Sequence, residues 1–306
     1  MPRNNKNIAV FDNFREKSIN VGRIKVNIAE AGEGVPIIMI HGWTNDWRGL
    51  APMGSFLIPN TRVILVDLPG YGQSSRLKHY SLKIEATVIK KLKNELGLKK
   101  FFILGHSMGS FVAAKYYQNF GKDLLGLIMV GGVFRKKARK RLFAAGRRIY
   151  GFAEKHEKAQ KVLGFLIKRK VYAYTAAWLM NMYKFDPKLI NQFGLVSRKN
   201  IDSKAYVEIG DEILNTDTEK LLGEGKVPVL FLYGKHDKIC NATQAKSIIG
   251  MEKYQFVEIE EAGHVVTVEQ PKKAAAAIWK FISSLQEQSN GRQRSLGHLG
   301  NTLPYD

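Results

Sequence analysis

The sequence predicts an α/β protein with a mostly parallel sheet, because short apolar runs alternate with helical patterns along most of the chain. Eight runs have the length of strands, and most are continuously apolar, as expected for strands that are buried on both faces. These runs are residues 18–21, 24–29, 36–40, 62–66, 101–104, 124–130, 227–232 and 256–259. Helical patterns lie between or after them at residues 82–96, 111–120 and 271–285.

The alternation is interrupted once, by a segment with no convincing strand. Between residues 133 and 222 apolar residues recur at helical spacing, in one stripe that includes Ile149 and Phe152 and another that includes Val162 and Leu166. We expect residues 133–222 to form a helical cap, inserted into a core made of residues 1–132 and 223–288. The polar stretch after residue 285 is expected to be mobile, with residues 289–306 as a flexible tail.

The net charge of +21 is unevenly distributed. Residues 135–170 hold fourteen Lys and Arg against Glu154 and Glu157, which places +12 of that charge in the first half of the insertion. Such a patch is typical of a protein that meets anionic lipid, nucleic acid or an acidic substrate, and equally of a solvated helix face. No nucleic-acid recognition fold accompanies it, so we expect no specific nucleic-acid binding and favour a peripheral contact with anionic membrane.

Apolar runs and cysteine content bear on location. The apolar stretch at residues 8–11 is too short for a signal-peptide core, and the longest run, residues 124–134, is too short to span a bilayer. The single cysteine, Cys240, cannot form an internal disulfide, and we interpret it as a small buried thiol. The sequence therefore predicts a cytoplasmic protein, with peripheral membrane contact as a further expectation.

The strongest chemical signal is Gly105-His106-Ser107-Met108-Gly109, between a strand run and a helical pattern. A nucleophilic serine needs its hydroxyl on a sharp turn, and the flanking glycines allow backbone to pack close to that turn. Serine also needs a base, and the chain order expected here is serine, acid, histidine. Of the seven histidines, only His264 and His298 follow the later strands, and His298 lies in the tail. His264 is the expected base.

Asp237 is the expected third member, because it follows the strand run at residues 227–232 and could accept the other ring N–H of His264. The end of the preceding strand run, residues 131–134, offers no carboxylate. Three acidic residues of the insertion remain alternatives: Glu208, Asp211 and Glu212.

An oxyanion needs two backbone donors. Met108, directly after the nucleophile, supplies one, and Trp43 in the His41-Gly42-Trp43 turn is expected to supply the other and to line the pocket. Asp67 precedes Ser107 in the chain and is interpreted as support for its own Pro-Gly turn. We expect neither a cofactor nor a metal, since no phosphate-binding loop and no zinc-ligand spacing occur in the sequence.

These motifs, in this order, resemble the α/β-hydrolase superfamily over about residues 21–285. The resemblance implies an eight-stranded, mostly parallel sheet, cofactor-free ester-type hydrolysis, and an insertion at the position of the family's cap domain. Epoxide hydrolases and haloalkane dehalogenases carry Asp where this chain has Ser107. Proline iminopeptidases carry a His-Gly-Gly-Pro-Gly run that the residues from His41 to Asn45 lack.

The expected activity is cleavage of a small-molecule carboxylic ester through an acyl-enzyme, as in a carboxylesterase or an acylglycerol-type lipase. One alternative is a carbon–carbon bond hydrolase of diketone-type acids, and another is a non-catalytic binding protein on the same fold. The side chains expected to line the substrate pocket are Trp43, Phe143, Phe152, Phe165, Tyr174, Trp178 and Met182.

Overall fold

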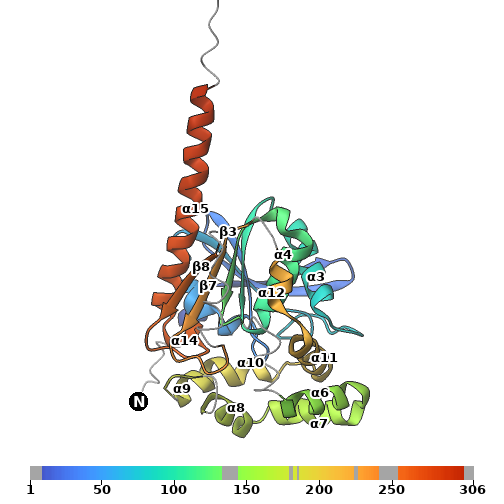
Figure 1. Ribbon diagram of the computed structural model, residues 1–306. Helices are drawn as coiled ribbons and strands as arrows, with labels where there is room; N and C mark the ends of the chain where they lie inside the picture. Colours follow the sequence, from blue (N-terminus) through green and yellow to red (C-terminus); the bar gives the residue numbers. More distant parts are fainter. Residues whose placement is uncertain are drawn as a thin grey trace, which may run out of the picture.

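A computed structural model of the chain describes residues 9–132, 144–178, 182–184, 186–223, 227–240 and 254–299. Within them, one eight-stranded sheet has helices on both faces, and a group of further helices lies across one end of it (Figure 1). The predicted fold class is confirmed. The strands are β1 Arg15–Val21, β2 Ile24–Ala31, β3 Val35–Ile40, β4 Thr61–Val66, β5 Phe101–His106, β6 Leu124–Val130, β7 Val229–Gly234 and β8 Tyr254–Ile259.

The sheet has the strand order β1-β2-β4-β3-β5-β6-β7-β8. The first two pairings, β1 with β2 and β2 with β4, are antiparallel, and all the others are parallel. The carboxyl ends of β3 to β8 therefore meet at the same edge. In open α/β sheets this is the edge where ligands bind.

Alternating residues of the central strands bury opposite faces of the sheet. Ile38 pairs with Ile103, and both belong to the core on the side of α3 (Leu82–Glu95) and α4 (Met108–Phe120). Their neighbours Met39 and Leu104 also pair, and they pack on the side of α2 (Ala51–Ser55) and α15 (Pro271–Leu299). A continuous apolar run is thus required, because both faces are covered.

The remaining core elements are short: α1 Ala9–Asp12, η2 Trp47–Gly49, η3 Gly121–Asp123 and α14 Val266–Glu269. The described part of the insertion is helical. Its elements are α6 Ala144–Lys155, α7 Glu157–Ile167, α8 Lys170–Ala176, α9 Pro187–Leu189, the π-helical η5 Ile190–Leu195, α10 Val196–Arg198, α11 Ser203–Asn215 and α12 Thr218–Leu222.

The predicted apolar stripe of α6 faces outward in its described part, and that of α7 is buried only in part, since Ile167 is buried and Leu163 packs against the core. Phe152 and Val162 are exposed, whereas Ala153 is buried on α6 and Gly164 is buried on α7. A Cβ atom on Gly164 would lie 1.7 Å from Ser203 Oγ at the start of α11, so these helices approach through their small residues. Close packing on that side leaves large apolar side chains such as Phe152 and Val162 outside.

Helix α15 runs beyond the predicted end near residue 285 and reaches Leu299, projecting from the body of the molecule (Figure 1). The expected tail is therefore helical as far as Leu299. Residues 286–299 contain no proline that would end the helix, although Gly291 and Gly297 lower their helix propensity. The apolar pattern marks where packing ends rather than where the helix ends.

Among the described helices, none has the length and apolar character needed to cross a bilayer.

Asp67, at the end of β4, organises the turns beside β3. Its Oδ1 accepts the N–H of Trp47 at 2.9 Å, and its Oδ2 accepts the N–H of Gln73 at 3.0 Å and Asn27 Nδ2 at 2.9 Å. The carboxyl is fully buried. These contacts fit the interpretation of Asp67 as turn support.

Asp67→Ala should lower the free energy of unfolding by about 3 kcal/mol or more, because three donors, two of them on buried residues, lose their acceptor. Urea denaturation followed by circular dichroism measures this change. Glu95→Ala, at an exposed position of α3, is the matched control and should change stability by less than about 0.5 kcal/mol. A loss below about 1 kcal/mol for Asp67→Ala would show that water or neighbouring groups replace the carboxylate.

Candidate active site

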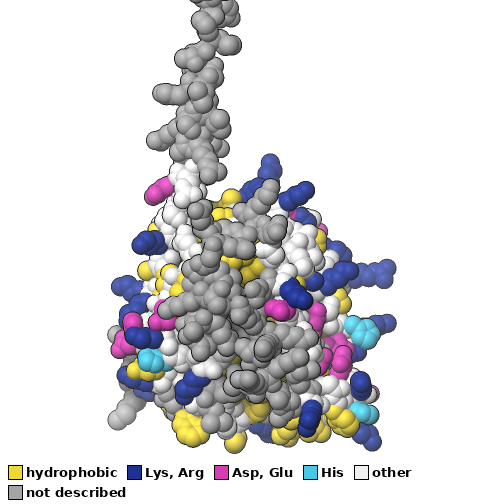
Figure 2. Space-filling view, viewed as in Figure 1, with side chains coloured by type: hydrophobic (Ala, Val, Ile, Leu, Met, Phe, Trp, Pro, Cys, Tyr) yellow, Lys and Arg dark blue, Asp and Glu magenta, His cyan; other side chains and the backbone are white. Residues whose placement is uncertain are grey.

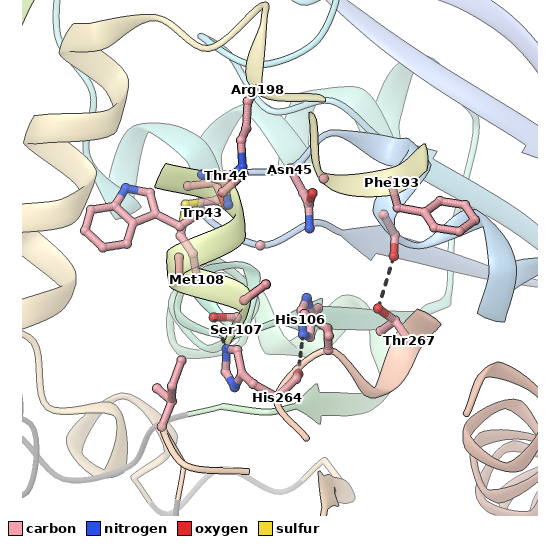
Figure 3. Close-up of a pocket in the computed structure, with 18 of the residues that line it drawn as sticks. Trp43, Thr44, Asn45, His106, Ser107, Met108, Phe193, Arg198, His264 and Thr267 are labelled. Atoms are coloured by element: carbon pink, nitrogen blue, oxygen red, sulfur yellow. Dashed lines mark hydrogen bonds between the residues drawn. The ribbon is translucent and has the colours of Figure 1, made fainter. Parts of the chain in front are cut away.

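Ser107 occupies a strained turn between β5 and α4. Its φ of 52° and ψ of −114° are unusual for any residue other than glycine. The Ser107 N–H donates to the carbonyl oxygen of Val130, at the end of β6, at 2.8 Å. The turn directs the side chain away from the sheet and into a pocket (Figure 3).

Two glycines of the motif are sterically required for this turn. A Cβ atom on Gly105 would lie 2.2 Å from the carbonyl oxygen of Gly109, and one on Gly109 would lie 2.3 Å from that of Ile40. Backbone atoms cannot move aside as a flexible side chain can. The Gly-x-Ser-x-Gly spacing therefore reflects the contact of strand, helix and β3 around the serine.

Loops after β7 and β8 bring Asp237 and His264 to Ser107. The Ser107 hydroxyl lies 2.8 Å from His264 Nε2, and His264 Nδ1 lies 2.9 Å from Asp237 Oδ2. Since the carboxylate can only accept, Nδ1 carries the proton and Nε2 accepts from the serine hydroxyl. The imidazole is 5% exposed, so this chain of hydrogen bonds is largely shielded from water.

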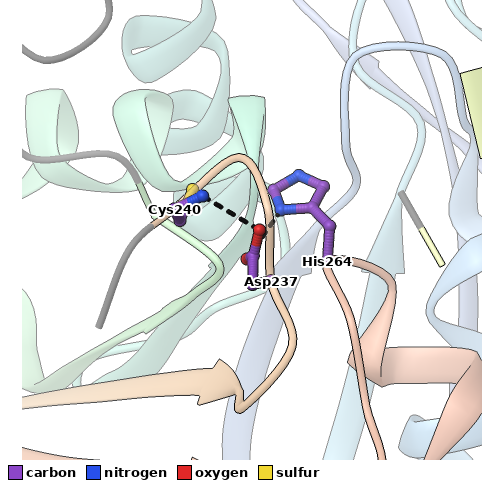
Figure 4. A group of neighbouring side chains, drawn as sticks. All are labelled: Asp237, Cys240 and His264. Atoms are coloured by element: carbon purple, nitrogen blue, oxygen red, sulfur yellow. Dashed lines mark hydrogen bonds and ion pairs between the residues drawn. The ribbon is translucent and has the colours of Figure 1, made fainter. Parts of the chain in front are cut away.

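Asp237 is itself fixed, because its Oδ1 accepts the N–H groups of Ile239 at 2.8 Å and Cys240 at 2.9 Å. Cys240 is buried beside it (Figure 4), and its Sγ donates to the carbonyl oxygen of Gly131 at 3.0 Å. Asp237, Cys240 and His264 each offer one atom that could ligate a metal, and these three atoms lie within 4.8 Å of one another. The hydrogen bonds that already join Asp237 to both neighbours make this group an anchor for the imidazole.

The alternative acids of the insertion are bound elsewhere. Glu208 accepts the N–H of Tyr80 at 2.7 Å, and Glu212 accepts the N–H of Leu82 at 2.6 Å, where both hold the start of α3. Asp211 Oδ2 accepts Asn215 Nδ2 at 3.1 Å. Of the four candidate acids, the structure brings Asp237 to His264.

Two supporting residues were not singled out from the sequence. His106 Nε2 donates to the carbonyl oxygen of His264 at 3.0 Å, and burial lowers the pKa of His106 to about 4, so its ring is neutral. Glu269 accepts the N–H of Gly263 at 2.8 Å and that of Tyr183 at 2.6 Å, and so joins the histidine loop to the cap. Burial raises the pKa of Glu269. The position of His106 beside the nucleophile is a usable sequence signal, whereas Glu269 has none.

Both expected oxyanion donors lie in the pocket wall. Met108 is the first residue of α4, so its N–H has no acceptor within the helix. Trp43 follows Gly42, and a Cβ atom on Gly42 would lie 3.6 Å from Ser107 Cβ. The turn after β3 thus passes directly beside Ser107.

The Trp43 ring also joins the core to the cap. It stacks on Tyr206 of α11 with ring centroids 4.7 Å apart, and its Nε1 donates to the Tyr206 carbonyl oxygen at 2.9 Å. A Cβ atom on Gly210 would lie 2.1 Å from this indole, so α11 needs glycine at that position.

The pocket is a cavity of about 200 Å³ between the core turns and the cap. Its walls are mainly apolar, and Thr44, Asn45 and Arg198 add polar groups on the side away from His264 (Figure 3). Apolar residues of the lining include Ala173, Met182, Ile190, Phe193, Ile213 and Val265. Such walls suit an acyl chain or another apolar group.

Four of the expected cap residues do not line this cavity. Phe152, Phe165 and Trp178 are exposed on the outer side of the cap, the first two because the small residues of α6 and α7 face inward. Tyr174 lies outside the lining, and its hydroxyl donates to Asn191 Oδ1 at 2.8 Å. Met182 and Trp43 do line the cavity, and Phe143 lies outside the described residues.

Comparison with known proteins places this geometry in a family. Monoacylglycerol lipase abhd6-A from Xenopus laevis is 26% identical over 280 residues, which cover 86% of this chain and 79% of that protein. A pimeloyl-(acyl-carrier protein) methyl ester esterase from Legionella pneumophila (strain Corby) is 27% identical over 252 residues, with 79% and 92% covered. The crystal structure of a membrane phospholipase A superposes with a TM-score of 0.74 at 19% identity and covers 91% of this chain and 89% of its own. Residues 35–271 match the model of the alpha/beta hydrolase fold family, and the chain belongs to that family.

Proposed function

We propose that this protein is a serine hydrolase that cleaves a carboxylic ester through an acyl-enzyme. The observation that carries the proposal is the hydrogen-bonded chain from Ser107 through His264 to Asp237, which opens into an apolar pocket. The ester-hydrolysing relatives named above support the same reaction class.

In the first half-reaction, Ser107 Oγ attacks the carbonyl carbon of the ester while its proton passes to His264 Nε2. Asp237 stabilises the imidazolium that forms. The carbonyl oxygen becomes an oxyanion, which the N–H groups of Met108 and Trp43 bind. Collapse of this intermediate breaks the bond to the alcohol oxygen, which takes the proton from His264, and leaves the acyl group on Ser107.

In the second half-reaction, water replaces the alcohol. His264 Nε2 takes a proton from the water as its oxygen attacks the acyl carbon, and the same two N–H groups bind the new oxyanion. Collapse breaks the bond to Ser107 Oγ, and the proton returns from His264 to the serine. The products are a carboxylic acid and the free enzyme.

The apolar lining favours an ester with a hydrocarbon portion, as in a carboxylesterase or an acylglycerol-type lipase. A carbon–carbon bond hydrolase of diketone-type acids would use the same three side chains. A binding protein would keep the pocket without a reactive serine. Reactivity and substrate class therefore need separate experiments.

A fluorophosphonate probe should label the wild-type protein and leave Ser107→Ala unlabelled, because an activated serine attacks phosphorus as it attacks a carbonyl. Intact-protein mass spectrometry measures the adduct. Absence of labelling in the folded wild type would favour a binding protein. Turnover of p-nitrophenyl hexanoate against a vinylogous diketone acid then separates the two hydrolases, and faster cleavage of the diketone would overturn the ester proposal.

Substitution of the three proposed catalytic residues should rank them by role. Ser107→Ala or His264→Ala should reduce kcat by about 10⁶-fold, and Asp237→Ala by about 10⁴-fold, because the carboxylate orients and stabilises without bonding to substrate. Steady-state kinetics and circular dichroism measure activity and folding together. Asp211→Ala is the matched control and should stay within about threefold of wild type, as expected for a carboxylate outside the hydrogen-bonded chain. The reverse ranking of Asp237 and Asp211 would place the acid in the cap.

A further inference from the structure

Arg198 is a buried cation in the wall of the reaction pocket. It ends α10, and its side chain is 5% exposed. Figure 3 shows it reaching from the cap toward Thr44, on the side of the cavity away from His264. Its charge therefore belongs to the environment that a bound substrate meets.

This guanidinium has few partners among the described residues. Nη1 donates to the carbonyl oxygen of Ile167 over a long 3.4 Å, and Nε has no hydrogen-bond partner. The ring of Tyr172 lies 5.6 Å from the guanidinium carbon. Burial lowers the pKa of Arg198, which reflects the penalty on its charge, yet arginine stays protonated in proteins.

Asp46, the acidic residue on the facing core turn, already forms hydrogen bonds with other side chains. Asp46 Oδ2 binds Arg48 Nη1 at 2.7 Å, and Asp46 Oδ1 accepts the hydroxyl of Ser197 at 2.8 Å. Tyr206, on the other side of Arg198, is a neutral phenol because burial raises its pKa well above the ordinary value. No carboxylate of the described chain forms an ion pair with Arg198.

An uncompensated buried cation is costly, and an entering anion can remove that cost. The planar guanidinium suits carboxylate and phosphate oxygens. We propose that Arg198 binds an oxyanion carried by the substrate, so that the preferred ester bears a carboxylate or phosphate group on the cap side of the pocket. The proposal rests on the proposed ester hydrolysis at Ser107 and names the class of ester.

Matched substrates test the proposal in two arms. The carboxylate arm compares the mono-p-nitrophenyl ester of adipic acid with p-nitrophenyl hexanoate, which has the same chain length without the charge. The phosphate arm compares a 1-acylglycerol 3-phosphate with the corresponding 1-acylglycerol. In each arm the readout is the ratio of kcat/KM for the anionic and neutral esters, which cancels any general loss of activity.

In at least one arm, Arg198→Met should lower the wild-type ratio by about tenfold to a hundredfold, as expected for loss of a charge-assisted hydrogen bond. The arm that responds identifies the anion. Arg198→Lys should keep part of the preference, and Lys199→Met, at the exposed neighbouring cation, should keep the wild-type ratio. Unchanged ratios in both arms for Arg198→Met would overturn the subsite.

Calorimetric binding to the wild type needs neither turnover nor a variant. Hexanoate or hexyl phosphate should bind at least about tenfold more tightly than 1-hexanol. Equal binding of all three would overturn the proposal even if Arg198→Met fails to fold. Failure of the ester reaction would appear separately, as an absence of fluorophosphonate labelling or as faster cleavage of the diketone acid than of p-nitrophenyl hexanoate.

The outer face of the cap carries a second, independent feature. Large apolar side chains are exposed there, with Val171 at 77% and Trp178 at 64%. Figure 2 shows hydrophobic side chains along the lower edge of the molecule, where α6, α7 and α8 lie in Figure 1. We call this the outer cap patch, and its residues are Ile149, Phe152, Val162, Phe165, Leu166, Val171 and Trp178.

Cations accompany the outer cap patch. The Arg169 guanidinium lies 3.8 Å from the centroid of the Phe165 ring, and Lys170 Nζ lies 5.1 Å from that of Tyr174. Between residues 148 and 170 there are seven Lys and Arg against two Glu. The denser basic run from Arg135 to Arg141 lies outside the described residues. Apolar side chains among cations are typical of segments that lie on anionic bilayers.

The patch is also close to the pocket. On α8, Tyr172 and Ala173 line the cavity, whereas Val171 faces solvent, so one helix separates the two. We infer that the outer cap patch docks on an anionic lipid surface. Each nearby Lys or Arg would contribute about 1 kcal/mol, which salt weakens, and the apolar side chains would insert at the headgroup boundary.

Co-sedimentation of the full chain with vesicles tests this docking. Binding should be stronger to vesicles containing phosphatidylglycerol than to pure phosphatidylcholine and should fall at high salt. The double variant Phe165→Ser and Trp178→Ser should weaken binding by about tenfold or more, since two apolar side chains no longer insert. Phe56→Ser is the matched control, because it removes an aromatic side chain that is 48% exposed on the core domain, outside the cap.

Three results would overturn the docking inference: equal binding to neutral and anionic vesicles, no loss in the double variant, or an equal loss in Phe56→Ser. A concentration-dependent dimer in the absence of lipid, abolished by the double variant, would instead assign the patch to a second copy of this chain. Sedimentation velocity measures that alternative.

Discussion

The left-handed turn at Ser107 is the constraint on which the rest of the site depends. A residue other than glycine in this conformation costs about 1–3 kcal/mol and persists only where its surroundings enforce it. Here the backbone contacts of Gly105 and Gly109, together with the hydrogen bond from Ser107 to Val130, provide that enforcement. With the serine fixed at the carboxyl edge of the sheet, the loops after β7 and β8 need only bring Asp237 and His264 to the same edge.

The pocket needs the cap to be held at a fixed height above that edge. Trp43 connects the Ser107 side of the core to α11 through its stacking and hydrogen bond with Tyr206. On the other side of the pocket, Glu269 accepts N–H groups from Gly263 and Tyr183, and so joins the histidine loop to the cap. Groups that orient the reacting residues thus also position the walls, so the shape of the cavity and the placement of His264 are physically coupled.

Sequence reasoning located the strands and the hydrogen-bonded residues because both follow local rules. Strands buried on two faces must be apolar throughout, and the glycines beside Ser107 are required by contacts at fixed spacing. The cap was harder, because an amphipathic pattern identifies an apolar stripe without identifying its neighbour. The small residues Ala153 and Gly164 are the buried contacts of α6 and α7, whereas Phe152 and Phe165 are exposed to solvent. Glu269 and Arg198 act through contacts that are distant in the chain, so no local pattern marks them.

The basic character of the chain has two different physical meanings. Cations on the outer cap are hydrated and screened by salt, so many are needed to produce an appreciable attraction, and their effect is general to any anionic surface. Arg198 is a single buried cation in the wall of the cavity, and the acid on the facing turn, Asp46, is held by Arg48 and Ser197. There, one charge acts at short range and in a fixed direction. We therefore propose that selection among esters depends on this one residue more than on the large net charge outside, and that the outer charge governs where the protein meets its substrate.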